Sequence, residues 1–325
     1  MKKDNANTLS ENATLVRLTT KHPSGIKSDK DLKEGLAIDQ KANNDSLHVA
    51  KYIFGREANR YFRRIINQFR NNYFYPLTVP WDDNTSDFEG KVLSGWRLCP
   101  NQELDRLMDK VNDAKVDFQK EVNSFLDNYD NLIEWNKHRL GDAFKLSDYP
   151  KKEVIETKFR FDFELGTVPQ FNSKDIRLNV SEKLRKKIEN DALKRATKNV
   201  EAITRTTVET LLESVEHLAD KLESYDPKTK GGGFFKNSTF DKLRQTLDTL
   251  PSINSDILGN DKKIAEAHQN LVSVFAKIND VNSLRDDDDY TDKKRKQLAD
   301  DLKDSVSDLA DDMKGGFLDS MYSKK

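Results

Sequence analysis

The segment between residues 51 and 75 carries the residue types that bind nucleic acid. It holds six Lys and Arg side chains against one acid, Glu57, and several aromatic side chains lie nearby. Cationic side chains contact phosphates, and aromatic rings stack on unpaired bases. One hypothesis is therefore a single-stranded nucleic-acid-binding protein. Its expected contacts are Lys51, Arg56, Arg60, Arg63, Arg64, Arg70, Tyr73 and Tyr75.

The same segment also fits an ordinary amphipathic helix from about Gly55 to Asn72. Its apolar residues recur at intervals of four, three and four and so share one face. These residues are Ala58, Phe62, Ile65 and Phe69. The arginines fall on the opposite face, which is the usual solvent side of such a helix. The aromatic residues then belong to a core, and both interpretations stay open.

Other residue types that could do chemistry form no recognisable site. The five histidines never lie at metal-ligand spacing with a second histidine, and the acidic run 286–289 lacks the pattern of a calcium loop. Asp82 and Asp83 fit a self-capping turn better than a metal pair. Cys99 is the only cysteine, and nothing near it in the sequence activates its thiolate.

Phosphate loops of the Gly-Lys-Ser or Gly-Lys-Thr type do not occur in the sequence. We therefore expect no metal, no cofactor and no catalytic residue, and we interpret the chain as a non-enzyme. An enzyme whose site is assembled from distant residues ranks third among the hypotheses.

Composition favours long, solvated helices over a compact enzyme. Of the 325 residues, 35% are hydrophobic and 34% are charged, and the formal net charge is -1. The net charge of the whole molecule thus favours neither nucleic acid nor a membrane as a partner. Any electrostatic attraction to them must come from a local cluster of charges. The N-terminus lacks the apolar stretch of a signal peptide, and no apolar run approaches a bilayer span. We expect a cytoplasmic protein without a membrane partner.

Patterning predicts a disordered tail over residues 1–14 and an α+β domain over 15–180. Apolar and polar residues alternate in three short segments, which predicts strands of a small sheet. The expected strands are 15–20, 159–164 and 176–180, and the expected helices are 55–72 and 101–139.

The remaining residues, 181–325, predict long helices that form a coiled coil or an antiparallel bundle. The first helix should run from Ser181 to about Tyr225, and three more are expected at 238–250, 262–284 and 291–313, after a flexible glycine joint at 231–233. Its apolar seam is narrow and therefore needs a partner helix. The seam expected to join copies of the chain is Val208, Leu211, Val215, Leu218 and Leu222.

An ordered set of short motifs within residues 15–180 resembles a family of tailed-bacteriophage proteins without an assigned activity. The resemblance implies a phage gene product working in the cytoplasm of the infected bacterial host, and it carries over no functional residue. The motifs are Pro80-Trp81-Asp82-Asp83, Phe125-Leu126-Asp127-Asn128-Tyr129, Leu140-Gly141-Asp142-Ala143-Phe144, Asp148-Tyr149-Pro150, Phe159-Arg160-Phe161-Asp162 and Val168-Pro169.

Two functional hypotheses follow from these patterns. The leading one is a non-enzymatic phage interaction protein that self-associates and binds protein partners through its helical seams. The alternative is the single-stranded nucleic-acid-binding protein whose contacts lie between residues 51 and 75.

Overall fold

The computed structural model is mostly α-helical with small antiparallel sheets, as the sequence predicts. It describes residues 9–55, 57–81, 95–168, 182–226, 235–278 and 280–314. The chain divides into two compact units, which we describe separately. Unit 1 comprises Met1–Val16, Pro76–Asp105 and Leu165–Lys325, and unit 2 comprises Arg17–Tyr75 and Arg106–Glu164.

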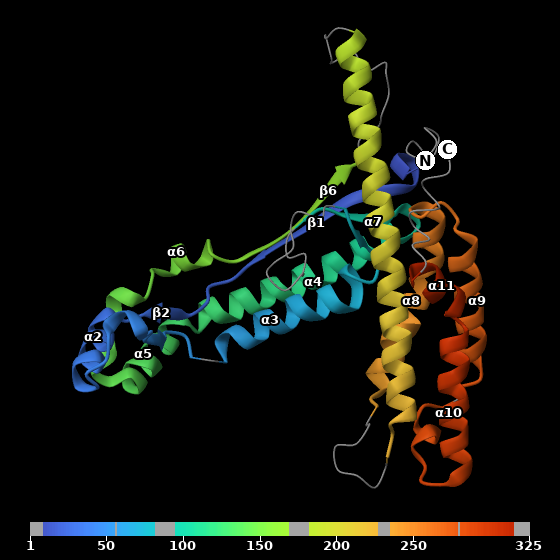
Figure 1. The fold of residues 1–325 in the computed structure, drawn as a ribbon. Helices are drawn as coiled ribbons and strands as arrows, with labels where there is room; N and C mark the ends of the chain where they lie inside the picture. Colours follow the sequence, from blue (N-terminus) through green and yellow to red (C-terminus); the bar gives the residue numbers. More distant parts are fainter. Residues whose placement is uncertain are drawn as a thin grey trace. The chain divides into compact units, whose positions relative to one another are not determined.

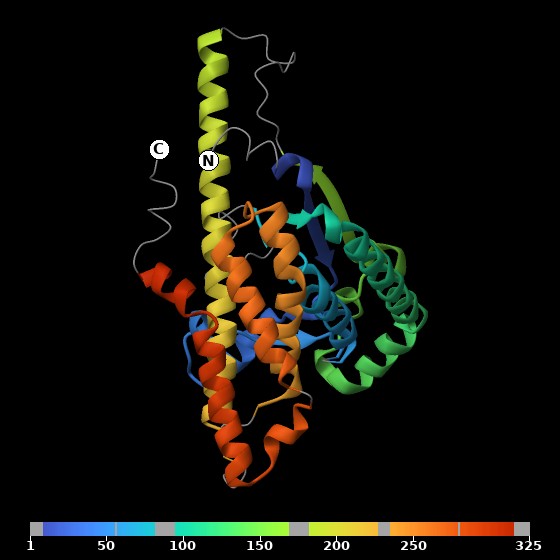
Figure 2. The same cartoon turned by 90° about the vertical axis from the view of Figure 1, so that its right-hand side faces the viewer.

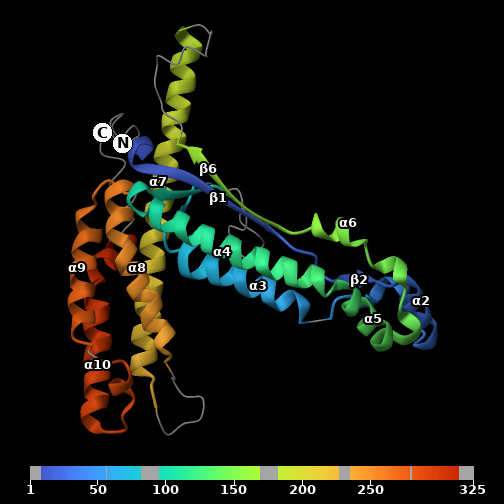
Figure 3. The same ribbon diagram turned by 180° about the vertical axis from the view of Figure 1, so that it is seen from behind.

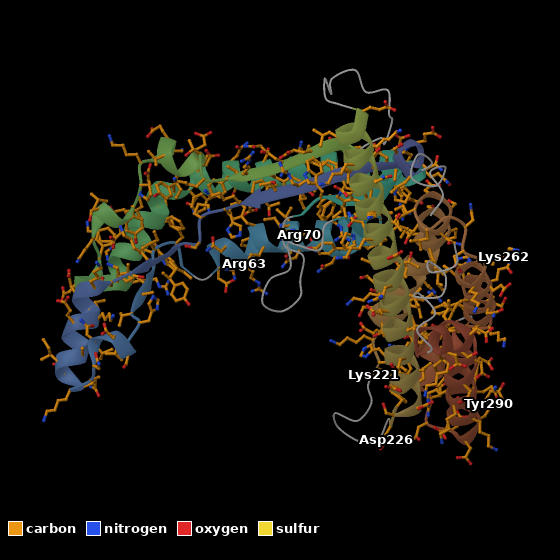
Figure 4. The ribbon with its side chains drawn as sticks, turned by 45° about the horizontal axis from the view of Figure 1, so that its top comes forward. Arg63, Arg70, Lys221, Asp226, Lys262 and Tyr290 are labelled. Carbon is orange, nitrogen blue, oxygen red and sulfur yellow. The ribbon has the colours of Figure 1, made fainter. Side chains whose placement is uncertain are left out.

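Long helices make up most of unit 1, and four of them lie side by side (Figures 1 and 2). The predicted helix from Ser181 is confirmed as α7, a single element of 42 residues. In Figure 4, Asp226 after α7 and Tyr290 at the start of α10 lie at the same end of these helices. The helices are α7 (Glu182–Glu223), α8 (Asn237–Asp256), α9 (Lys262–Ala276), η6 (Asn282–Arg285), α10 (Asp289–Asp304) and α11 (Ser307–Lys314).

The expected oligomer seam of α7 is corrected by the packing of unit 1. All five seam residues are at least 94% buried, and they belong to one apolar cluster with residues of α8, α9 and α10. Leu218 and Leu222 are 0% and 1% exposed. The narrow seam does have partner helices, as its pattern requires, but they come from the same chain. The seam is therefore buried within one chain and is not available to a second copy.

Proline does not end α8, although the expected helix stopped just before it. Pro251 lies inside the helix and has no N–H to donate to the carbonyl of Leu247. The Nε2 of His268 lies 3.0 Å from that carbonyl oxygen. A carbonyl oxygen only accepts, so the imidazole N–H donates and replaces the missing helical bond. This contact explains why the helix continues through Pro251 to Asp256.

The acidic run before α10 acts as a helix cap. The Asp288 side chain accepts a hydrogen bond from the backbone N–H of Thr291 at 2.8 Å, and the Thr291 hydroxyl donates to its other oxygen at 2.8 Å. These bonds lower the pKa of Asp288 below its ordinary value. The glycine joint predicted at 231–233 lies outside the described residues.

A four-stranded sheet has the strand order β4-β5-β1-β6. β1 pairs antiparallel with β5, with Leu15 opposite Leu98. Residues 9–12 form a helical turn and Leu9 is buried, so the predicted disordered tail does not extend through residues 9–14. The strand predicted at 176–180 lies outside the described part of the chain. The strands are β4 (Val79–Pro80), β5 (Arg97–Pro100), β1 (Ala13–Lys21) and β6 (Arg160–Thr167).

Unit 2 is built around aromatic side chains from α3, α4 and the strand predicted at 159–164. The ring centre of Phe159 lies 4.9 Å from that of Phe62, and the ring centre of Phe161 lies 5.6 Å from those of Phe69 and Phe118. The alternating phenylalanines therefore do turn one face inward. Figure 3 shows α3 and α4 side by side. The elements are β2 (Ile26–Ser28), α2 (Lys30–Asp39), η1 (Asn44–Ser46), β3 (Ala50–Tyr52), α3 (Ala58–Phe69), η2 (Arg70–Phe74), α4 (Asn101–Asp127), α5 (Tyr129–Leu140), η4 (Gly141–Ala143), η5 (Leu146–Asp148) and α6 (Lys152–Glu156).

The helix predicted over residues 101–139 is interrupted at Asn128. This residue leaves helical geometry, with φ -97° and ψ 7°, and α5 starts at the next position. Tyr129 then donates a hydrogen bond to the Pro150 carbonyl at 2.8 Å, while burial raises its pKa to about 12. Two of the motifs quoted above thus meet, and their contact has a structural role.

Candidate nucleic-acid interface

The exposed side of α3 carries part of the predicted nucleic-acid site. Phe62, Ile66 and Phe69 are buried, which leaves the arginines between them facing outward. Arg60, Arg63 and Arg64 are exposed. Figure 4 shows Arg63 on α3 and Arg70 on the adjoining η2. From residue 58 to residue 75 the chain contains no Asp or Glu, so the acid nearest to these arginines in the sequence is Glu57.

Two arginines of this face already have neighbours that hold them. Arg60 pairs with Glu57 at 3.2 Å, but both side chains are about three-quarters exposed, so the pair is weak. The Arg64 guanidinium lies 5.3 Å from the centre of the Tyr61 ring. Such a contact orients the cation and keeps its outer edge available.

The other predicted contacts do not join this face. Lys51 is 5% exposed and lies within a buried ion-pair network, so it is removed from the site. Arg70 is half-buried and donates to the Thr20 hydroxyl at 2.9 Å. Tyr73 is half-buried, with the Lys110 ammonium 5.6 Å from its ring centre, and Tyr75 is also half-buried. Arg56 lies outside the described residues.

A groove of about 830 Å³ opens beside this face, between α3 and α5. Two exposed aromatic rings line it, Tyr61 of α3 and Trp135 of α5, with exposures of 46% and 53%. The Arg139 guanidinium lies 4.3 Å from the centre of the Trp135 ring. The full lining is Phe54, Gly55, Glu57, Tyr61, Asn128, Asn131, Leu132, Trp135 and Arg139.

Glycine at position 55 shapes one wall of the groove. Its φ of +72° is unfavourable for residues with a side chain, and an added Cβ would lie 3.1 Å from the Trp135 ring. The same Cβ would lie 3.4 Å from the Arg139 guanidinium. Gly55 therefore lets the stacked pair of Trp135 and Arg139 lie directly against the backbone.

Trp135 and Arg139 are site residues that the sequence analysis does not assign. Their spacing of four on a helix places them on one face, where an Arg can stack on an aromatic ring. That spacing was the available signal. The groove that places α5 beside Tyr61 of α3 is a tertiary feature, and no local pattern contains it.

The buried Lys51 has a full set of acceptors. Its ammonium group lies 2.6 Å from Asp29 Oδ2, 2.7 Å from Asp148 Oδ2 and 2.9 Å from the carbonyl oxygen of Ala143. An ammonium group has three protons, and three acceptor oxygens lie within 3 Å of this one. Asp29 also caps α2 by accepting from the Leu32 N–H, and Asp148 also pairs with Lys27 at 3.0 Å. The network joins β3, α2 and η5 within unit 2.

These contacts shift the pKa values of all three groups. Hydrogen bonding from Lys51, then from Leu32, lowers the pKa of Asp29. Burial alone would raise the pKa of Asp148, but hydrogen bonds from Lys51 and Lys27 outweigh burial and lower it. Burial alone would lower the pKa of Lys51, but its bonds with Asp148 and Asp29 outweigh burial and raise it. The charged form is favoured at every position.

Acid is therefore expected to weaken unit 2. The lowered folded-state pKa values of Asp29 and Asp148 contribute stability that is complete above the unfolded value of about 4 and is lost as the pH falls through the folded values. Urea unfolding followed by Trp135 emission between about pH 7 and pH 3 should show this loss. The double variant Asp29→Asn, Asp148→Asn should be less stable near neutral pH, and its free energy of unfolding should fall less between about pH 7 and pH 3. An equal fall in both proteins would contradict the role given to the two carboxylates.

Other chemistry considered for the chain finds no support among the described residues. Cys99 is fully buried, and burial, with Glu103 and Asp256 nearby, raises its pKa to about 12, which makes its thiol a poor nucleophile. Within the described ranges, no three His, Cys, Asp or Glu side chains gather as metal ligands. The ring of His22 stacks on that of Phe62, with 5.9 Å between the ring centres, so this histidine has a packing role.

Comparisons with known proteins add one similarity. The chain matches no curated protein and no solved structure. Residues 89–227 match a family model described as "Protein of unknown function (DUF3150)". The matched range includes α4, α5 and α7, and its description names no activity.

Proposed function

We propose that the protein binds single-stranded nucleic acid through unit 2. The observation that supports this most directly is the exposed arginine face of α3, with Arg60, Arg63 and Arg64 and no acid between residues 58 and 75. Cations at helical spacing can follow successive phosphates of a strand. Unit 2 also contains 23 Lys and Arg against 19 Asp and Glu, so it is basic although the whole chain has a net charge of -1.

The affinity for a strand should depend on these arginines and on salt. Replacing Arg60, Arg63 and Arg64 by Gln is expected to reduce the salt dependence of binding, because three phosphate contacts no longer release counterions. At about 0.7 per contact for single strands, the slope of log K against log salt should fall by about 2. A fluorescence anisotropy titration of labelled oligothymidylate at several salt concentrations measures it.

A matched triple variant tests whether position matters or only charge. Lys151, Lys152 and Lys158 are exposed in the same unit and do not belong to α3. Their replacement by Gln removes the same charge and should leave the slope almost unchanged. Equal losses in both triple variants would show non-specific attraction, and no binding of the wild-type protein at low salt would refute the proposal.

Protein binding is a second candidate function, and exposed apolar side chains of α2 favour it. Leu32 and Leu36 lie one turn apart and are 43% and 42% exposed, and Ile38 is 77% exposed. Among the described helices, none is long and apolar enough to cross a membrane. A pull-down from cells, with and without nuclease, separates protein partners from partners held by nucleic acid. Loss of every partner after nuclease would count against this second function.

The setting and the finer architecture are also part of the proposal. The motif resemblance supports a phage gene product acting without catalysis in the host cytoplasm. The short connection between α8 and α9, residues 257–261, supports an antiparallel bundle in unit 1 over a coiled coil. Self-association must use a surface other than the seam of α7, because that seam is filled by α8, α9 and α10.

A further inference from the structure

We infer that the groove between α3 and α5 is a stacking site for an unpaired base, which selects single strands over duplexes. The inference rests on the proposed function and names the part of the ligand that this groove takes. Its support is the pairing of each exposed ring with an arginine: Tyr61 with Arg64, and Trp135 with Arg139. Bases stack both on aromatic rings and on guanidinium planes.

The two stacked pairs supply complementary contacts. The Trp135 indole, with the Arg139 guanidinium stacked on it, offers a flat surface together with a positive charge. One site can therefore hold a base and the phosphate next to it. Both rings and the Arg139 guanidinium line the same groove, and its volume of about 830 Å³ leaves room for a nucleotide. A paired base is covered by its neighbours in a duplex and cannot enter such a groove without being unstacked.

Polar groups of the groove fit the edge of a base. The amides of Asn128 and Asn131 line the groove, and an amide both donates and accepts hydrogen bonds. Glu57 is the one acid of the lining, and its partner is Arg60 at 3.2 Å. The groove therefore combines aromatic surface, amides and one arginine, Arg139, which matches a nucleotide better than it matches a purely apolar ligand.

Position along the chain explains how the groove and the arginine face act together. Tyr61 belongs to α3 and lies beside Arg60 and one turn before Arg64. A strand whose phosphates follow the arginines of α3 thus passes the mouth of the groove. On the opposite wall, Gly55 leaves room for the Trp135 ring, because any side chain at position 55 would press on that ring.

Trp135→Ala is expected to weaken binding of oligothymidylate about 10-fold, because the stacking surface below Arg139 is lost. The slope against salt should stay as in the wild type, since no phosphate contact is removed. Trp135→Phe keeps a ring and should restore most of the affinity. An abasic strand of equal length should bind the wild type and Trp135→Ala alike.

The outcomes separate this inference from the proposed function. If strands bind with the expected salt dependence but Trp135→Ala binds as the wild type does, the base site is refuted and the arginine face stands. Equal wild-type affinity for abasic and normal strands refutes it as well. If no strand binds at low salt, the proposed function fails first. Circular dichroism of Trp135→Phe and Trp135→Ala checks that both variants fold.

Discussion

Replacement of Leu218 by Asp is expected to lower the free energy of unfolding by about 4 kcal/mol or more. Leu218 is fully buried in the core that α7 shares with α8, α9 and α10. Truncation of a buried leucine alone costs about 2–5 kcal/mol, and a carboxylate without a partner adds the cost of its desolvation. Urea unfolding followed by the emission of Trp81 and Trp96, which pack against this core, measures the loss.

The same substitution on the same helix provides the control. Leu184 lies near the start of α7 and is 45% exposed, so Leu184→Asp should change the free energy of unfolding by no more than about 0.5 kcal/mol. Light scattering on the folded fraction distinguishes a core from an oligomer seam. A Leu218→Asp protein with wild-type stability and a lower mass would show that the seam joins copies of the chain after all.

The pattern of α7 shows what the sequence determines and what it leaves open. Its periodicity predicts the helix and the buried face from Val208 to Leu222 correctly, because both follow from local spacing. The identity of the covering helices does not follow, since α8, α9 and α10 satisfy a narrow seam as well as a second copy would. Whether helices of the same chain or a second copy cover the seam depends on chain connectivity and tertiary packing.

Short elements in the sheets were missed for a different reason. β5 consists of four residues, all buried, including Arg97. Such a strand shows no alternation, and its charged residue argues against burial until its partner is known. The Arg97 guanidinium donates to the Thr78 hydroxyl at 2.6 Å and to the Thr78 carbonyl at 2.7 Å. These bonds connect β5 with residues that precede β4, which no local window contains.

The candidate site divides in the same way. The arginines of α3 were predicted because their spacing is local, whereas Lys51 was assigned to the wrong environment. A lysine is normally exposed, and its burial here depends on acceptors at Asp29, Ala143 and Asp148. No sequence pattern assigns Trp135 to the site, and it is half-exposed beside Arg139.

Lys51→Met is expected to destabilise unit 2 by about 3–5 kcal/mol, the usual cost of removing one partner from a buried ion-pair network. Asp29 and Asp148 would remain buried near each other without the cation between them, and the Ala143 carbonyl would lose its donor. Urea unfolding followed by Trp135 emission measures the effect. Lys145→Met is the matched control, because Lys145 pairs with Asp31 at the surface and should contribute about 1 kcal/mol or less.

Adding Asp29→Asn and Asp148→Asn to Lys51→Met tests the source of that loss. If the cost comes from two unpaired carboxylates, neutralising them should recover a large part of it, and Asn at position 29 can still cap α2. If the triple variant is no more stable than Lys51→Met, the loss comes from the missing hydrogen bonds and packing of the lysine. A Lys51→Met protein as stable as Lys145→Met would contradict the buried network itself. Because Lys51 lies away from the arginine face, Lys51→Met protein that remains folded should bind oligothymidylate as the wild type does.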